Sequence, residues 1–148
     1  MKYSNRSKVQ FLIAVILLIP IAVSGCILVV EEDYDRRDHL RGTNWYLEIV
    51  FYGVRTIAAP EQGVELSFVD ENRIEGVSQC GPFNGVYSLN DRDELSIDSF
   101  SSDGGICESD EASSLFLSQL PRAKQLIRED ESLRINTGRG NYLMFLEK

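Results

Sequence analysis

The sequence has few of the residues on which most catalytic and metal sites depend. Its 148 residues include one histidine, His39, together with three cysteines and one tryptophan. His39 lies in a charged stretch that we interpret as a tether, where nothing fixes the orienting partner that a catalytic base requires. Cys80 and Cys107 lack CxxC spacing and a nearby histidine, so they make a poor zinc ligand set. We therefore expect no metal and no cofactor, and most histidine-dependent hydrolase mechanisms are excluded.

Basic residues are also scarce, since 15 Lys and Arg stand against 23 Asp and Glu and give a formal net charge of -8. Affinity for nucleic acid depends on Lys and Arg contacts to phosphates, so no nucleic-acid partner is expected. Anionic headgroups should repel such a chain, and membrane contact is therefore expected through an attached lipid. The acidity itself predicts a soluble, self-repelling surface.

Residues 1–25 are predicted to be a lipoprotein signal peptide. Three basic residues and no acidic one occur among the first eight, and the apolar run Phe11–Val23 follows. A basic start and a short apolar core are typical of secretory signals. The next segment, Val23-Ser24-Gly25-Cys26, resembles the lipobox of bacterial lipoprotein precursors. This resemblance implies cleavage before Cys26 and attachment of lipid to its sulfur.

An uncleaved membrane anchor is the alternative, because Phe11–Val30 has about the ~20 residues that a membrane-spanning helix needs. Pro20, Ser24 and Gly25 interrupt that stretch and favour the cleaved signal. Both interpretations place the remaining chain outside the cytoplasm. Ile27 rather than Asp follows the cysteine, so we expect a lipid-anchored protein of the cell envelope, on the outer membrane facing the periplasm if the host is Gram-negative.

Residues 26–42 are predicted to be a lipidated, charged tether, and residues 43–148 one small domain. The segment Glu31–Gly42 is highly charged and shows no apolar period, as expected of a tether. The remaining roughly 105 residues suffice for one core.

Alternation of apolar and polar residues predicts a mostly β domain. Trp45–Tyr52 is rich in aromatic and β-branched types, which predicts a strand with Trp45, Leu47, Ile49 and Phe51 on one face. In Val64–Phe68 the odd-numbered residues are polar and the others apolar. Further strands are predicted at Arg73–Ser78, Asn84–Leu89, Glu94–Ile97, Leu133–Ile135 and Tyr142–Leu146, the last two flanking a glycine-containing hairpin turn at Thr137–Gly140.

One helix is predicted between these strands. Ser109 can cap it, and apolar residues then recur at helical spacing until Pro121: Ala112, Leu115, Phe116 and Leu120. Ala123, Leu126 and Ile127 suggest a further helical turn. The whole pattern predicts an α+β fold, in which a curved, half-barrel-like antiparallel sheet packs against one helix.

The cysteine count predicts a disulfide. If Cys26 carries lipid, Cys80 and Cys107 remain as a pair in an oxidising compartment. Such a bridge would contribute ~3–4 kcal/mol through the entropy of the unfolded chain. Free or metal-bound thiols are the alternatives.

The segment Gln79–Tyr87 resembles the central motif of the META domain family, whose bacterial members include HslJ-like heat-shock proteins. Cys80, Gly85 and Tyr87 match the motif in spacing, whereas Gln79 and Gly81 replace its first glycine and its asparagine. The family's opening Trp-x-Leu corresponds to Trp45 and Leu47. The resemblance extends over Thr43–Lys148, where Cys107, the helix and the closing strands follow in the family's order.

The resemblance implies a curved antiparallel sheet with a packed helix, in an envelope or secreted protein linked to stress tolerance and without established catalytic activity. The motif residues are expected to be structural. Gly85 should meet a need for positive φ or close approach, and Trp45 and Tyr87 should belong to the core.

The leading functional hypothesis is a non-enzymatic envelope lipoprotein that binds another envelope protein or a small apolar ligand in the concavity of its sheet. A purely structural cap on a lipidated stalk is a further possibility. The alternative is a hydrolase that uses loop carboxylates, either Asp91, Asp93 and Glu94 or Asp103 and Glu108. The segment Gly138-Arg139-Gly140 is too short for a phosphate-binding loop.

Overall fold

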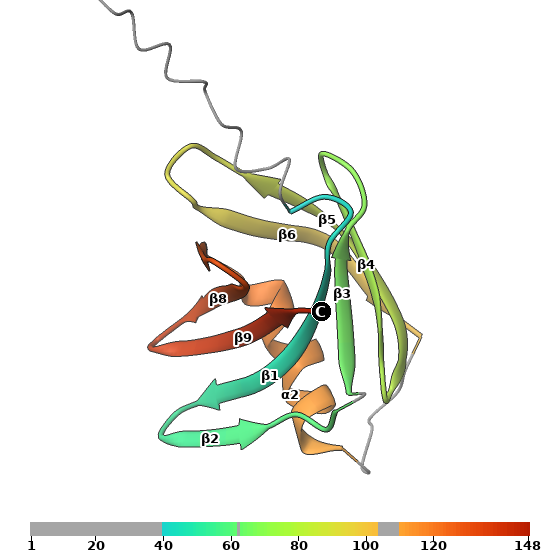
Figure 1. Cartoon of the computed structure of the whole chain (residues 1–148), viewed down its shortest axis with the longest axis vertical. Coiled ribbons are helices and arrows are strands. Elements are labelled where there is room, and N and C mark those ends of the chain that lie inside the picture. The colour runs from blue at the N-terminus through green and yellow to red at the C-terminus, as the bar shows by residue number, and fades with distance from the viewer. Residues whose placement is uncertain (1–39, 62, 104–109) are drawn as a thin grey trace, which may run out of the picture. The chain divides into compact units, whose positions relative to one another are not determined.

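The computed structural model describes residues 40–61, 63–103 and 110–148, so the predicted signal peptide, Cys26 and His39 lie outside the described residues. One curled antiparallel sheet and a helix make up this region (Figure 1). The elements in chain order are β1 (Asn44–Tyr52), β2 (Arg55–Ala58), β3 (Val64–Phe68), β4 (Arg73–Ser78), β5 (Gly81–Leu89), β6 (Leu95–Ser102), α2 (Glu111–Gln119), the 3-10 turn η2 (Leu120–Arg122), β7 (Gln125–Glu129), β8 (Ser132–Gly138) and β9 (Asn141–Glu147).

The strands pair in the order β6-β5-β4-β3-β1-β9-β8-β7, and β2 pairs with the last four residues of β1. The sheet curls until its two edge strands meet. There the backbone N–H of Leu95 donates to the carbonyl of Lys124 at 3.0 Å, and that of Leu126 donates to the carbonyl of Asp93 at 2.9 Å. The predicted fold, a curved half-barrel with one packed helix, is therefore confirmed.

Side chains of the sheet and the helix fill the concave side. None of the core hydrophobic residues is more than 8% exposed. Phe116 of α2 lies at the centre of this core, with its ring centroid 5.1 Å from that of Phe83 and 6.1 Å from that of Phe145. The interior of the curled sheet is thus packed by the protein's own residues.

Strand β1 departs from the predicted alternation. Its register against β9 shifts between Leu47 and Ile49, which marks a β-bulge. A bulge inserts one extra residue and so exchanges the two faces for the rest of the strand. Val50 is consequently buried, while Ile49 and Phe51 lie on the outer face. The prediction that Ile49 and Phe51 share the inner face of Trp45 was wrong.

The helix lies where it was predicted, but a different residue caps it. Asp110, rather than Ser109, is the N-cap residue, and its carboxylate accepts from the backbone N–H groups of Ala112 and Ser113 at 3.2 Å. Ser109 lies outside the described residues. Leu115 is only half-buried. The α-helix ends at Gln119, and Pro121 lies in the 3-10 turn η2 that follows it.

The segment after the helix is a strand, so the predicted helical turn at Ala123–Ile127 was wrong. Strand β7 pairs along its whole length with β8, and this long-range pairing overrides a short apolar pattern that is ambiguous by itself. β5 also begins three residues before its predicted start, β6 extends to Ser102, and β2 was not predicted. The β8–β9 hairpin is confirmed, with positive φ at Arg139 and Gly140.

Candidate functional site

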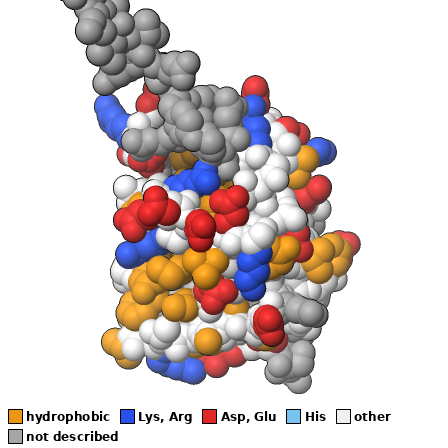
Figure 2. Space-filling model, in the orientation of Figure 1, with side chains coloured by type: hydrophobic (Ala, Val, Ile, Leu, Met, Phe, Trp, Pro, Cys, Tyr) orange, Lys and Arg blue, Asp and Glu red, His pale blue; other side chains and the backbone are white. Residues whose placement is uncertain are grey.

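The outer face of β1 and β9 is unusually apolar. After the bulge, three cross-strand pairs point away from the core, and we call these six residues the outer ladder: Tyr46–Leu146, Ile49–Met144 and Phe51–Tyr142. The solvent side of an antiparallel sheet is ordinarily polar. All six ladder residues are half-buried or exposed, and hydrophobic side chains gather on this face in Figure 2.

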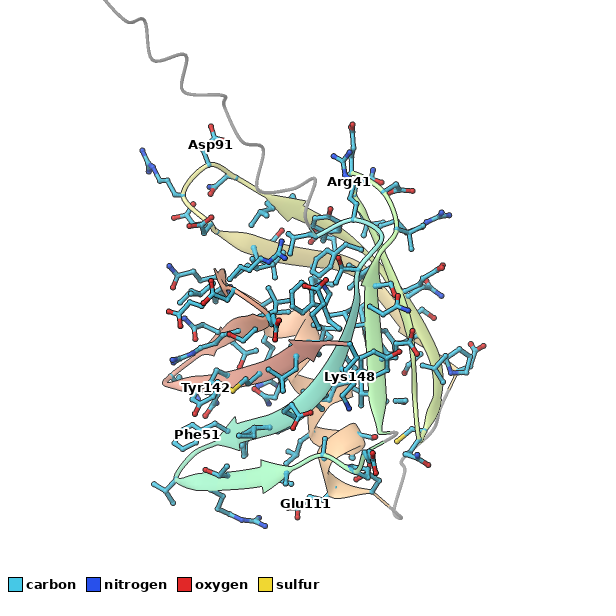
Figure 3. All side chains as sticks on the ribbon, viewed as in Figure 1. Arg41, Phe51, Asp91, Glu111, Tyr142 and Lys148 are labelled. Atoms are coloured by element: carbon cyan, nitrogen blue, oxygen red, sulfur yellow. The ribbon has the colours of Figure 1, made fainter. Side chains whose placement is uncertain are left out.

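Each end of the ladder has an aromatic ring beside a cation. Phe51 and Tyr142 stack with centroids 5.0 Å apart and planes 9° from parallel (Figure 3), and the guanidinium carbon of Arg134 lies 4.1 Å from the Tyr142 ring centroid. At the other end, the Lys148 ammonium lies 5.3 Å from the centroid of the Tyr46 ring. Tyrosine and arginine are among the residue types enriched at the energetic centres of protein interfaces.

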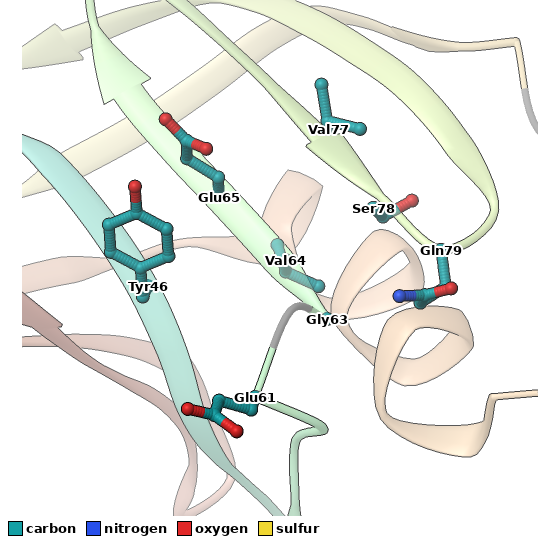
Figure 4. A pocket seen from close by; sticks show the side chains of 8 residues that line it. All are labelled: Tyr46, Glu61, Gly63, Val64, Glu65, Val77, Ser78 and Gln79. Carbon is teal, nitrogen blue, oxygen red and sulfur yellow. The ribbon is translucent and has the colours of Figure 1, made fainter.

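A pocket of about 400 Å³ adjoins the Tyr46 end of the ladder. It lies on the outer side of β1, β3 and β4, next to the loop that precedes β3 (Figure 4). Its lining combines an aromatic ring, two carboxylates and an exposed aliphatic side chain: Tyr46, Glu61, Gly63, Val64, Glu65, Val77, Ser78 and Gln79. The backbone N–H of Gln79 donates to the Gly63 carbonyl at 3.0 Å and holds the two sides of the pocket together.

The motif cysteine occupies the two-residue turn between β4 and β5. Cys80 is disulfide-bonded, and its N–H donates to the Ser78 hydroxyl oxygen at 3.2 Å. Cys107 lies outside the described residues, so its pairing with Cys80 stays a prediction. Gly81, where the family motif has asparagine, has a φ of +116°. Glycine adopts this conformation without strain, which explains the residue found there.

The other motif residues lie in the core. Trp45 and Leu47 are buried, and the Tyr87 hydroxyl donates to the Asp70 carbonyl at 2.9 Å. Gly85 does not have positive φ, and a Cβ there would meet its neighbours at an ordinary 3.4–3.5 Å. The expectation of positive φ or close approach was therefore wrong for Gly85, which lies where the β5–β6 register shifts.

The close approach occurs instead at Gly76, for which no role was predicted. A Cβ on Gly76 would lie 2.0 Å from the Glu65 carbonyl oxygen and 2.5 Å from the Phe83 ring. A glycine inside a predicted strand was the available signal.

The carboxylates considered for hydrolysis lie in turns. Asp91 and Glu94 are exposed and Asp93 is half-buried in the β5–β6 turn, where the Asn90 amide donates to Glu94 at 2.6 Å. Asp103 is exposed at the end of β6, and Glu108 lies outside the described residues. None of these four described carboxylates lines the pocket next to the ladder.

Two further observations concern only the described part of the chain. No group of three His, Cys, Asp or Glu side chains there could hold a metal ion. None of the helices there is long and apolar enough to cross a membrane.

Comparison with known proteins identifies the domain. The META domain family matches residues 38–148. The chain belongs to the META domain family. This finding agrees with the motif around Cys80, and it extends the domain five residues before Thr43. No curated protein matches the chain.

Solved structures resemble this META domain in fold at low sequence identity. A DUF4847 family protein from Bacteroides vulgatus has a TM-score of 0.58 and 13% identity, covering 74% of this chain and 95% of its own. A protein from Burkholderia xenovorans, solved by NMR, has a TM-score of 0.61 and 18% identity, covering 75% of this chain and 85% of its own. At these identities the resemblance concerns the fold alone.

Proposed function

We propose that this META domain protein is a non-catalytic, lipid-anchored module of the cell envelope that binds another envelope protein through the outer ladder. The observation behind the proposal is the ladder itself, a continuous apolar stripe with an aromatic–cation pair at each end. Its residue types, Tyr, Phe, Met and Arg, are enriched at protein interfaces.

The outer face is favoured over the concavity because the fold already uses the concave side. The core residues there are at most 8% exposed, which leaves the described interior occupied by the chain's own side chains. A small apolar ligand would have to displace that packing. The ladder, in contrast, can be covered without any rearrangement of the core.

The proposed location has two independent supports. The leader and lipobox-like segment before Cys26 are typical of an exported lipoprotein. The second support is the disulfide at Cys80, which is independent of the leader. Stable disulfides are typical of oxidising compartments outside the cytoplasm.

Lipidation is tested by growing cells with labelled palmitate. The native chain should incorporate label and stay with membranes through a high-salt wash, whereas Cys26→Ser should take up no label and be released by the wash. Equal labelling of the Cys26→Ser variant would contradict lipid attachment at this residue. Membrane association of the unlabelled variant that withstands the high-salt wash would point to the uncleaved anchor, because electrostatic contacts are screened by salt.

Binding through the ladder is tested in cells with a photo-crosslinking phenylalanine derivative at Tyr46. We expect a discrete crosslinked product that weakens at least tenfold when Met144→Asp is added, because a charge at the centre of the ladder should cost as much as loss of a hot-spot residue, ~2 kcal/mol or more. The same probe at Val86, exposed on β5, should give no such product. A product that survives Met144→Asp, or none from any ladder position, would overturn the proposal and favour a structural cap.

A further inference from the structure

Two hairpin turns lie side by side at the far end of β1. The β1–β2 turn contains Gly53 and Val54, and the β8–β9 turn contains Arg139 and Gly140. The Gly53 N–H donates to the Asn141 side-chain oxygen at 2.9 Å and joins the two turns directly. Figure 1 shows both hairpins pointing to the same side of the molecule. We call them the paired tips.

The paired tips expose apolar side chains to solvent. Val54 is 94% exposed at the second position of a two-residue turn, where small polar residues or glycine are usual. Tyr52, at the end of β1, is 42% exposed. An aliphatic residue at a hairpin tip beside a half-exposed tyrosine has no packing role within the described domain.

The paired tips and the opposite ends of the strands differ in charge. Segments 51–56 and 134–142 contain three arginines and no acidic residue. The turns at the other end, in segments 69–72, 90–94 and 129–131, contain eight acidic residues and one arginine. Arg55 is partly offset by Glu111 at 3.0 Å, whereas Arg134 and Arg139 have no carboxylate partner among the described residues.

We propose that the paired tips dock on an anionic lipid surface. Val54 and Tyr52 enter the interfacial region of the bilayer, and Arg139 faces the phosphate headgroups. Tyrosine favours this depth because its ring is apolar and its hydroxyl polar, and each nearby arginine adds attraction to anionic lipid. This second membrane contact is made by protein side chains and is separate from any lipid on Cys26.

The acidity of the whole chain does not prevent this contact. The acidic turns lie one strand length from the tips, about 30 Å for the nine residues of β1. The Debye length at physiological salt is only about 8 Å, so the headgroups act mainly on the tips. Repulsion of the acidic end then favours the orientation with the tips toward the membrane.

The proposed anchor is compatible with this orientation. The described chain begins at the acidic end, where Arg41 lies 3.8 Å from Glu71. Thirteen residues separate Cys26 from Leu40 and can span at most about 45 Å. This length exceeds the strand, so a chain anchored at Cys26 can place its tips on the same membrane.

The test measures flotation of residues 26–148 with Cys26→Ser, a chain without leader or lipid, on vesicles. Its outcome therefore does not depend on acylation. Vesicles of phosphatidylglycerol and phosphatidylethanolamine (one to three) should retain at least ten times more protein than vesicles of phosphatidylcholine. Val54→Asp should abolish this difference, and Arg139→Asn should reduce binding about fivefold, since one arginine near the surface is worth about 1 kcal/mol.

Two matched variants serve as controls. Val86→Asp places the same change on an exposed valine of β5, and Arg92→Asn removes an exposed arginine from the acidic end. Both should bind as the parent chain does. Absence of flotation on the anionic vesicles, or equal losses in Val54→Asp and Val86→Asp, would overturn the proposal. Binding of an acidic protein by the tips without any vesicle binding would overturn it in favour of a protein partner.

Discussion

Compared side by side, the two faces of strand β1 differ in surroundings but hardly in residue type. The inner face is fully buried and belongs to the core: Trp45, Leu47 and Val50. The outer face is just as apolar yet remains half-exposed: Tyr46, Ile49 and Phe51. The hydrophobic effect explains the first set through burial on folding, but it gives no such account of the second. The proposed contact with a partner outside the domain would cover this second set.

The largest difference is expected from replacing one aromatic residue on each side of the sheet with alanine: Phe116 of α2 on the inner side and Phe51 of β1 on the outer side. Phe116→Ala should lower the free energy of unfolding by about 3–5 kcal/mol, because Phe116 is completely buried between Phe83 and Phe145. Phe51→Ala should cost only about 1–2 kcal/mol, mainly through its stacking on Tyr142. Urea denaturation followed by circular dichroism measures both. Equal losses would mean that the outer ladder is part of the core.

Alanine substitutions at two glycines of the sheet should have effects of intermediate size on stability. Gly76→Ala should destabilise the domain by about 1–3 kcal/mol, because the added Cβ would lie 2.0 Å from the Glu65 carbonyl oxygen. Gly85→Ala, at the motif position, should change stability by less than about 1 kcal/mol, since its Cβ finds ordinary contacts. Thermal unfolding of the two variants makes the comparison. A larger loss at Gly85 would show that the motif glycine has a tighter backbone requirement than its geometry indicates.

The smallest expected effect concerns the cation at the end of the ladder. Arg134→Gln should lower stability by about 0.5–1 kcal/mol or less, because the guanidinium on the Tyr142 ring is exposed to solvent. The same variant should weaken the photo-crosslinked product from Tyr46 more clearly than it weakens folding. A stability loss above 2 kcal/mol would instead assign Arg134 to the scaffold.

Much of the fold could be predicted from local alternation. In β3, inward and outward residues follow the sequence pattern, and the β8–β9 hairpin lies where its glycines indicate. The helix between Asp110 and Pro121 could also be predicted, because the spacing of its apolar residues is a local property, although Asp110 rather than Ser109 caps it. Strand β7 was misread because its short apolar run fits a helix or a strand equally well, and only pairing with β8 decides between them.

The outer ladder was harder to predict, although one signal was present. Residues Ile49–Tyr52 are apolar without interruption, which indicates a strand with two apolar faces. The bulge after Leu47 decides which of them face the core, and it arises from pairing with β9 almost a hundred residues later. The pocket beside Tyr46 gave no local signal, because β1, β3, β4 and a loop contribute to it together.

The sequence by itself thus determined much of the core, the positions of most strands, the acidic composition and the expectation of export. Each of these depends on residue type or on spacing over a few positions. The tertiary structure alone decided the face exchange in β1, the meeting of the edge strands and the joining of the two hairpin tips. Those features depend on hydrogen bonds between residues distant in the chain, and such register choices leave little trace in local periodicity.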